Sequence, residues 1–349
     1  MHEQIDAIMR HAEEHSNFSG VCLLTRGNDI LYHRAFGLAH RGFAIPNRTS
    51  TRFDIASITK LFTAVAVMQL IERAAFGLET AVMPYLGRSG TKISDAVTVF
   101  HLLTHTSGIA DDADEEAGES YEALFVDKPN YAIRETIAFL PQCIEKDPVF
   151  APGEGVRYNN CAFILLGLMV EKASGQPYRD YVRDNVFAPA DMTGADFCAM
   201  DEVNHDLAEH YKAVTRDDGT VMWKKNIYSY PPVGSPDGGA TVTALDLDAF
   251  LRATVGGRLL GEDATALLRR PHVLVDDGDD YRLMNGFAFE YRVAPDDRII
   301  SIEKEGENAG VASQLFHYPK HDTTLVLLAN QDCNVQKIVR DIERLILET

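Results

Sequence analysis

Segments with β-strand character lie near both ends of this chain, and helical patterns fill its middle. Near the start, apolar and β-branched runs at 21–25 and 30–35 flank Gly27-Asn28-Asp29, which indicates a β-hairpin. From about residue 284, the runs NGFAFEYRV, DRIISIEKE, SQLFHYP and TTLVLLANQ indicate successive antiparallel strands. The simplest architecture pairs the strands from the two ends in one antiparallel sheet.

Helical patterns complete this outline. Amphipathic runs at 1–15 and 335–347 predict terminal helices that cover the sheet. Between the ends we expect a long helix that Ser57 or a neighbour caps and that ends just before Gly77, a buried helix that ends near Gly175, and a helix that starts near Thr243. The acidic stretch 111–120 is interpreted as an exposed loop. The sequence thus predicts an α+β fold, with a sheet domain from 1–62 and 241–349 and a mainly helical second lobe from 63–240.

The charge of the chain excludes some partners. The 349 residues carry 33 Lys and Arg against 52 Asp and Glu, a net charge of −19, which repels nucleic acid and anionic membrane surfaces. The run at 1–15 has no apolar core typical of a signal peptide, and no run is long enough to span a membrane, so we expect a cytoplasmic protein without nucleic-acid or membrane partners. Five cysteines without C-x-x-C spacing suggest neither a disulfide framework nor a zinc site.

The segment Ser57-Ile58-Thr59-Lys60 is the first candidate for chemistry. Residues three apart share a helix face, so the Ser57 hydroxyl and the Lys60 amine can approach each other. The helix N-terminus would stabilise negative charge on Ser57, and burial of Lys60 would favour its neutral amine, a competent base. The same spacing recurs at Ser89 and Lys92 in a glycine-rich loop without an apolar helix, where we interpret it as accidental.

A second candidate is Tyr158-Asn159-Asn160, in a loop that leads into the buried helix. Tyr158 could relay protons to a leaving group, and the Asn160 amide could hold a substrate carbonyl or orient Lys60. Taken alone, a Tyr and an Asn in a loop are also typical of turns.

Together these segments resemble the penicillin-recognising serine hydrolases, namely class C β-lactamases, D-alanyl-D-alanine carboxypeptidases and their esterase relatives. FDIASITKLFTA is similar to the nucleophile motif of that family, HLLTHTSGI to a signature segment, and FAPGEGVRYNNCAFILLG to its Tyr-x-Asn motif. GGATVTALDLDAF and NGFAFEY are similar to further family segments, so the resemblance covers about 18–330.

The resemblance implies a β-lactamase/transpeptidase-like fold and a role for each residue. Ser57 would be the acylated nucleophile, Lys60 and Tyr158 would share the acid and base work, and Asn160 would contact the substrate or Lys60. One oxyanion donor would be the Ser57 amide and the other an amide on a late strand. Metal and organic cofactors are not expected, and the substrate would be a small ester, amide or β-lactam.

The third family motif, Lys-Thr-Gly or His-x-Gly on the late strand, is altered. KEGENAGVASQLFHYP stands in its place, and we place Glu307-Asn308-Ala309 on the motif and Gly310 as the second oxyanion donor. Glu307 would repel the carboxylate of β-lactams and peptides, which favours an esterase or amidase acting on neutral or cationic substrates. A β-lactamase, a D-amino-acid or D-Ala-D-Ala peptidase, and a non-catalytic binding protein on the same fold remain alternatives.

Other features carry weaker signals. His101 and His105 have a metal-like spacing, but the Glu of H-E-x-x-H is missing, so we expect structural roles. Trp223, Tyr228 and Tyr230 could line a substrate pocket or pack in the core.

Overall fold

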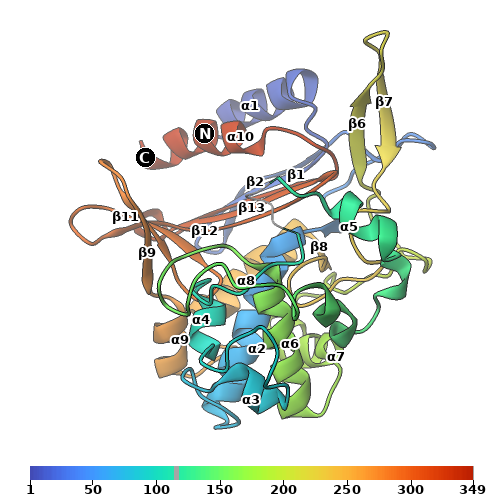
Figure 1. Ribbon diagram of the computed structural model, residues 1–349. Coiled ribbons are helices and arrows are strands. Elements are labelled where there is room, and N and C mark those ends of the chain that lie inside the picture. Colours follow the sequence, from blue (N-terminus) through green and yellow to red (C-terminus); the bar gives the residue numbers. More distant parts are fainter. Residues whose placement is uncertain (114–117, 349) are drawn as a thin grey trace.

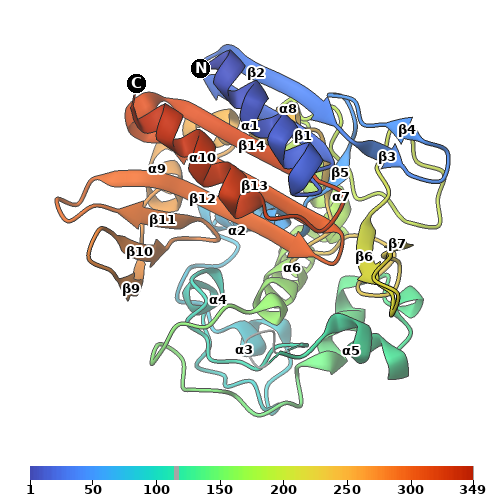
Figure 2. The same cartoon turned by 90° about the horizontal axis from the view of Figure 1, so that it is seen from above.

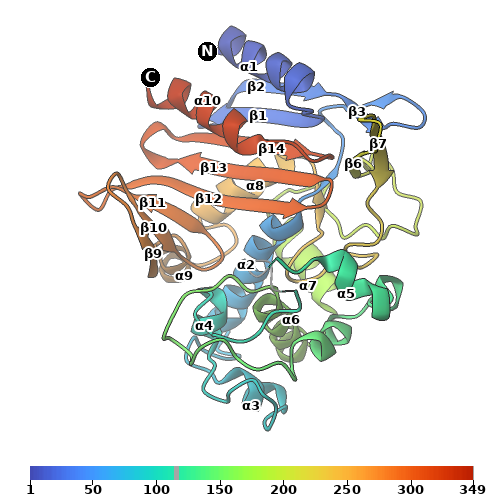
Figure 3. The ribbon, with the colours of Figure 1, turned by 45° about the horizontal axis from the view of Figure 1, so that its top comes forward.

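The centre of the molecule is an eight-stranded antiparallel sheet with the strand order β2-β1-β14-β13-β12-β11-β10-β9 (Figure 3). The computed structural model describes residues 1–113 and 118–348. The strands of this sheet are β1 (Gly20–Arg26), β2 (Asp29–Phe36), β9 (Val273–Asp277), β10 (Arg282–Asn285), β11 (Glu290–Val293), β12 (Ile299–Asn308), β13 (Val311–Tyr318) and β14 (Thr323–Ala329).

The two ends of the chain meet in this sheet, as the sequence predicted. β1 pairs with β14 from Gly20 opposite Ala329 to Arg26 opposite Thr323, and β1 also forms the expected hairpin with β2. Both central strands are buried almost throughout, because each of their faces is covered. The closure of the sheet by remote segments confirms the α+β antiparallel architecture.

Two terminal helices cover one face of the sheet. α1 (His2–His15) and α10 (Val335–Leu347) lie side by side above β1, β14 and β13 (Figures 1 and 2). Their apolar sides, which include Met9 and Ile342, pack in one cluster with sheet residues such as Leu325. Arg292 on β11 bridges Glu303 on β12 and Glu343 on α10, and this network ties the last helix to the sheet.

A helical region lies against the opposite face (Figure 1). It is built around α2 (Lys60–Glu72), which has buried residues on all sides, and α6 (Asn160–Ser174), and these two helices pack on each other. Its other α-helices are α3 (Val82–Leu86), α4 (Val99–Leu103), α5 (Tyr121–Asp127), α7 (Tyr178–Val182), α8 (Ala244–Val255) and α9 (Glu262–Leu268). Short turns of helix are η1 (Ala56–Thr59), η3 (Asn130–Ala132), η4 (Thr136–Gln142), η5 (Arg183–Phe187) and η6 (Pro319–His321).

Several local predictions need correction. α2 ends at Glu72, earlier than the expected position before Gly77. Ser57 lies within the 3₁₀ turn η1, and its neighbour Thr59 stands at the N-cap of α2 without a capping bond from its side chain. Short strand pairs were not anticipated; they join β3 (Leu38–His40) to β4 (Ile45–Pro46), β5 (Phe53–Asp54) to β8 (Thr241–Val242), and β6 (Tyr211–Thr215) to β7 (Val221–Lys225).

The acidic stretch 111–120 also differs from the prediction, although its residues 114–117 lie outside the described part of the chain. Asp112 is buried rather than exposed, and Asp111 is half-buried. α10 has its predicted limits, α1 begins one residue after the start of the predicted run 1–15, and α6 ends as predicted at Gly175, which has a left-handed conformation. Among the described residues no helix combines the length and apolar character needed to cross a membrane. The division into a sheet domain and a helical domain stays a prediction.

Candidate active site

Ser57 lies in a tight, strained turn between β5 and α2. The residue before it, Ala56, has a φ of 41°, a left-handed conformation that is unfavourable for a residue with a side chain. Two contacts hold this turn: the Ala56 N–H donates to Asp54 Oδ1 at 2.7 Å, and the Gly239 N–H donates to the Ala56 carbonyl at 3.3 Å. The turn therefore presents Ser57 at the wall of a pocket.

Lys60 is completely buried and its amine has three acceptors. Nζ donates to Ser57 Oγ at 3.0 Å, to Asn160 Oδ1 at 2.7 Å and to the Asp237 carbonyl at 2.6 Å. Three acceptors match the three N–H bonds of an ammonium group. The sequence interpretation expected a neutral amine here, whereas these contacts favour the charged form.

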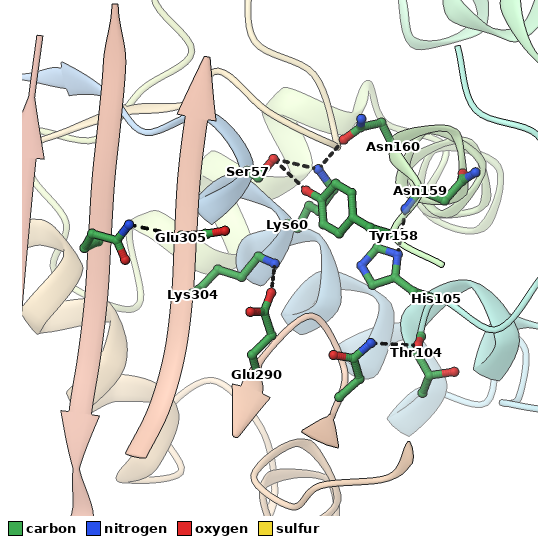
Figure 4. A network of polar contacts seen from close by, with 12 residues as sticks. Ser57, Lys60, Thr104, His105, Tyr158, Asn159, Asn160, Glu290, Lys304 and Glu305 are labelled. Atoms are coloured by element: carbon green, nitrogen blue, oxygen red, sulfur yellow. Dashed lines mark hydrogen bonds and ion pairs between the residues drawn. The ribbon is translucent and has the colours of Figure 1, made fainter. Parts of the chain in front are cut away.

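Tyr158 lies next to Lys60 and also reaches Ser57 (Figure 4). Its hydroxyl donates to Ser57 Oγ at 2.7 Å. The ring stacks on His105 with 4.6 Å between ring centroids, and the amines of Lys60 and Lys304 lie 4.9 and 5.1 Å from the Tyr158 centroid. Two cations next to this ring favour negative charge on its oxygen.

His105 supports Tyr158. It is buried and has a φ of 59°, and its Nδ1 accepts the Asn159 N–H at 3.1 Å, which places the proton of the neutral ring on Nε2. Burial, reinforced by Lys304 and Lys60, holds the pKa of His105 well below its usual range, so the ring is neutral at pH 7. His101 instead contacts the Thr98 backbone N–H at 3.2 Å, as part of the N-terminal cap of α4.

Asn160 is oriented by contacts on both ends of its amide. Its Oδ1 accepts from Lys60, while Nδ2 donates to Tyr121 at 2.5 Å and to Asp111 at 3.3 Å. Asp111 also accepts the backbone N–H groups of Asn160 and Cys161 at the start of α6. Sequence reasoning missed Asp111, because no local pattern connects this carboxylate with a helix that begins far along the chain.

The late strand passes Ser57 in a register that differs from the prediction. A Cβ atom on Gly306 would overlap the Ile55 carbonyl oxygen, so Gly306 is the residue that lets β12 approach the Ser57 turn. Gly310 lies in the turn after β12, where its N–H already donates to Asp332 at 2.6 Å. Placing the motif on Glu307-Asn308-Ala309 with Gly310 as oxyanion donor was therefore wrong, because the close approach of the two backbones occurs earlier, at Gly306.

Lys304-Glu305-Gly306 takes the place of the third motif at Ser57. Lys304 and Gly306 share a strand face, whereas Glu305 points to the other face and bonds Gln336 of α10 at 2.8 Å. The Lys304 side chain is only 1% exposed and pairs with Glu290 on β11 at 2.6 Å (Figure 4). Sequence reasoning missed Lys304 as a site residue, although the K-x-G spacing was the available signal.

The pocket beside Ser57 is rich in carboxyl groups. It is lined by Asp54, Asp112, Asp237 and Glu307, together with Asn160, Asn308 and Tyr230. Burial raises the pKa of each of these four carboxyl groups, and neighbouring acids add to the effect at Asp112 and Glu307. The one cation among the described site residues that bonds directly to Ser57 is Lys60.

The three aromatic residues near the Pro/Gly loop have separate positions. Tyr230 lines the pocket, and its hydroxyl lies 2.6 Å from His210 Nδ1. Trp223 stacks under Arg41 at 3.7 Å, and Tyr228 is exposed. The second Ser-x-x-Lys copy is a surface feature, with Lys92 paired to Asp147 at 2.8 Å.

Known proteins share this architecture. The profile of the Beta-lactamase family matches residues 5–347. The crystal structure of a penicillin binding protein from Bacillus halodurans superposes with a TM-score of 0.89 at 36% identity, covering 98% of this chain and 99% of that one. Penicillin-binding protein 4* of Bacillus subtilis is 28% identical over 91% of this chain and 69% of its own length. Esterase EstB of Burkholderia gladioli is 34% identical over 57% of this chain and 52% of its own length. The chain belongs to the β-lactamase family of serine hydrolases.

Proposed function

We propose that this protein hydrolyses ester or amide bonds of small molecules through an acyl-enzyme formed on Ser57. The observation that carries the proposal is the convergence of Lys60 Nζ and the Tyr158 hydroxyl on Ser57 Oγ, at 3.0 and 2.7 Å. A serine becomes an effective nucleophile when a proton acceptor lies within hydrogen-bond distance and a charged group fixes its geometry.

Tyr158 is the group that we assign to proton transfer. Lys60 has its three N–H bonds occupied by acceptors, so it is suited to stabilise charge rather than to take a proton. The reaction starts with Tyr158 as the phenolate, the form that the two lysine amines beside its ring favour. As Ser57 Oγ attacks the carbonyl carbon, the Ser57 proton passes to the Tyr158 oxygen, and Tyr158 then gives it to the leaving oxygen or nitrogen. Attack by water on the acyl-enzyme reverses these transfers and releases the acid.

Backbone amides of Ser57 and Glu307 are our candidates for the oxyanion donors. The two-residue turn after β12 makes Asn308 and Val311 the closing pair of the β12–β13 hairpin. Hydrogen bonds alternate between the two sides of an antiparallel strand, so the Glu307 N–H points away from β13. The paired part of β11 ends at Glu290, opposite Glu303, which leaves this edge of β12 open toward the pocket.

The preferred substrates follow from the charge of the pocket. Four carboxyl groups line it, and Lys304 is buried and paired, which favours neutral or cationic esters and amides over substrates that carry a carboxylate. The similarity of this chain to Esterase EstB supports an esterase activity. One observation favours β-lactam or D-amino-acid peptide hydrolysis as the second candidate: Lys304 lies beside Tyr158, where a cation could attract a carboxylate.

A fluorophosphonate probe and a substrate panel test the proposal. We expect the probe to label the wild type and not the Ser57→Ala variant, while a Ser89→Ala control labels normally. Rates on p-nitrophenyl esters, a chromogenic cephalosporin and D-amino-acid amides then rank the two candidates. If folded wild-type protein neither reacts with the probe nor turns over any of these compounds, the chain is a binding protein on this fold and the proposal fails.

A further inference from the structure

The ion pair between Lys304 and Glu290 is the least expected feature of the site. The two side chains meet at 2.6 Å, and they are 1% and 30% exposed. Lys304 Nζ also lies 5.1 Å from the centre of the Tyr158 ring, whose hydroxyl bonds the Ser57 oxygen. The half-buried carboxylate of Glu290 thus pairs with a buried cation that lies beside the ring of Tyr158.

We propose that Glu290 is a selectivity-determining residue, which turns the site away from carboxylate-bearing substrates by neutralising Lys304. The inference rests on the proposed hydrolase function of Ser57. It adds the reason why the enzyme would prefer neutral or cationic substrates. Glu290 acts through Lys304 and is not assigned any contact with the substrate.

The physical reason is the range of electrostatic interactions in a buried site. A lone ammonium acts over several ångströms in such a medium, whereas a close ion pair acts as a dipole whose field decays faster. Among the described residues Lys60 is the other cation near Ser57, and His105 is neutral, so with Lys304 compensated one cation is left to attract an anion. A substrate carboxylate near Ser57 therefore gains little attraction.

Removal of the negative charge should therefore reverse part of the preference. In Glu290→Gln, the amide keeps the size of the side chain and can still bond Lys304, but Lys304 becomes an uncompensated buried cation. Because Lys304 is buried beside Tyr158, its field toward Ser57 is screened less than it would be in bulk water. The change should raise the affinity for anionic substrates in particular.

The test uses two substrates that share the acyl group and the nitrophenyl ring, of which one carries a free carboxylate and the other its neutral methyl ester. 3-Carboxy-4-nitrophenyl acetate and its methyl ester have the same acyl group and release nitrophenols that can be followed by absorbance. The readout is the ratio of kcat/KM for the anionic over the neutral acetate. We expect this ratio to rise about tenfold in Glu290→Gln, mainly through a lower KM for the anionic acetate.

Three further variants distinguish the neutralisation of Lys304 from a general effect of removing a negative charge or of changing the Glu290 side chain. Glu305→Gln removes a negative charge one residue from Lys304 on the opposite strand face, and the ratio should stay near the wild-type value. Glu290→Asp keeps the charge and should also keep the ratio. Glu290→Gln combined with Lys304→Gln removes both charges and should return the ratio toward wild type. If Glu290→Gln does not fold, Glu290→Ala provides the same charge change with a smaller side chain.

The inference is overturned if a folded Glu290 variant without the charge keeps the wild-type ratio, or if Glu305→Gln raises the ratio equally. It is also overturned if the double variant retains the full increase, since the gained attraction would then not come from Lys304. The proposed function fails separately, when the wild type hydrolyses neither acetate and does not react with the fluorophosphonate probe.

Discussion

At the scale of single residues, Tyr158 is fixed by partners on all sides. His105 stacks on its ring, two lysine amines lie near the ring, and its hydroxyl meets Ser57. Such preorganisation is expected of a group that moves a proton, because little reorganisation is then needed during the reaction.

Replacing Tyr158 with Phe tests this assignment. The variant keeps the ring and its stacking but loses the oxygen, so we expect kcat/KM for a p-nitrophenyl ester to fall about 10²–10⁴-fold, with a melting temperature close to that of the wild type. Tyr228→Phe is the matched control, because the Tyr228 side chain is exposed. A Tyr158→Phe enzyme with more than a tenth of wild-type activity would contradict the role.

His105 should make the stability of the protein depend on pH. Burial lowers the pKa of His105 in the folded protein, so the unfolded chain binds this proton more readily. The stabilisation is complete above the unfolded pKa of about 6.5 and is lost as the pH falls below it. His105→Asn keeps an acceptor for the Asn159 N–H and suits the left-handed backbone.

We expect the variant to be less stable at pH 7.5 and its deficit to shrink by about 1 kcal/mol at pH 5.5. Urea unfolding at the two pH values measures this difference. An exposed histidine provides the control: His205→Asn should leave the pH dependence as in the wild type. A deficit of equal size at both pH values would show that His105 is not held neutral by the fold.

At the scale of elements, the contact between β12 and η1 determines the site. Gly306 lies where any side chain would meet the backbone of Ile55, so the strand can move close only because this residue has none. Gly306→Ala should therefore push β12 away from Ser57 and cost about 2–4 kcal/mol of stability, with a large loss of activity.

Gly77→Ala is the matched control for Gly306→Ala, because the nearest atom to its added Cβ would be 3.9 Å away. Thermal unfolding and ester hydrolysis compare the two variants. If Gly306→Ala were as stable and active as Gly77→Ala, the close packing of β12 on the Ser57 turn would not be required for the reaction.

The elements also mark where sequence reasoning succeeded and where it could not. α10, the β1–β2 hairpin and the end of α6 at Gly175 are encoded by local periodicity and by a terminal glycine, so the sequence predicted them. The register of β12 is different, because KEGENAG contains two glycines and either could lie at a close approach. Only packing against η1 selects Gly306, and packing is not visible in a local pattern.

The same reason explains the missed members of the site. Asp111, which caps α6, and Glu290, which pairs with Lys304, lie on segments whose own patterns indicate only a loop and a strand. Ser57, Lys60 and Tyr158 were predicted because their residue types and spacing carry chemistry within short motifs.

At the scale of the whole molecule, the sheet joins the two ends of the chain, and a buried polar cluster fixes their junction. Asn330 follows β14 and is fully buried; it accepts from Ser19 at 2.8 Å and donates to the Leu38 and Glu209 carbonyls at 3.0 and 2.8 Å. Each partner comes from a different part of the sequence. The pairing of β1 with β14 therefore depends on both ends being present together.

The net charge of −19 is a property of the entire chain and should affect its stability. Like charges repel more strongly in the compact state than in the expanded one, and salt screens this repulsion between exposed groups. We expect the melting temperature to rise by a few degrees when NaCl increases from about 20 to about 300 mM. Salt weakens the attraction between Lys304 and Glu290 only slightly, because Lys304 is buried. This pair should therefore not offset the rise in melting temperature.

The end of β9 and the loop that follows it offer a direct test of whether this repulsion lowers the stability. Asp276 and Asp277 at the end of β9 and Asp279 and Asp280 in the loop are exposed, and their replacement by Asn removes negative charge without disturbing buried contacts. The variant should melt at a higher temperature than the wild type at low salt, and its further gain from NaCl should be smaller. A melting temperature that falls with added NaCl, or a gain that the variant does not reduce, would mean that favourable surface ion pairs outweigh the repulsion among the excess acidic residues.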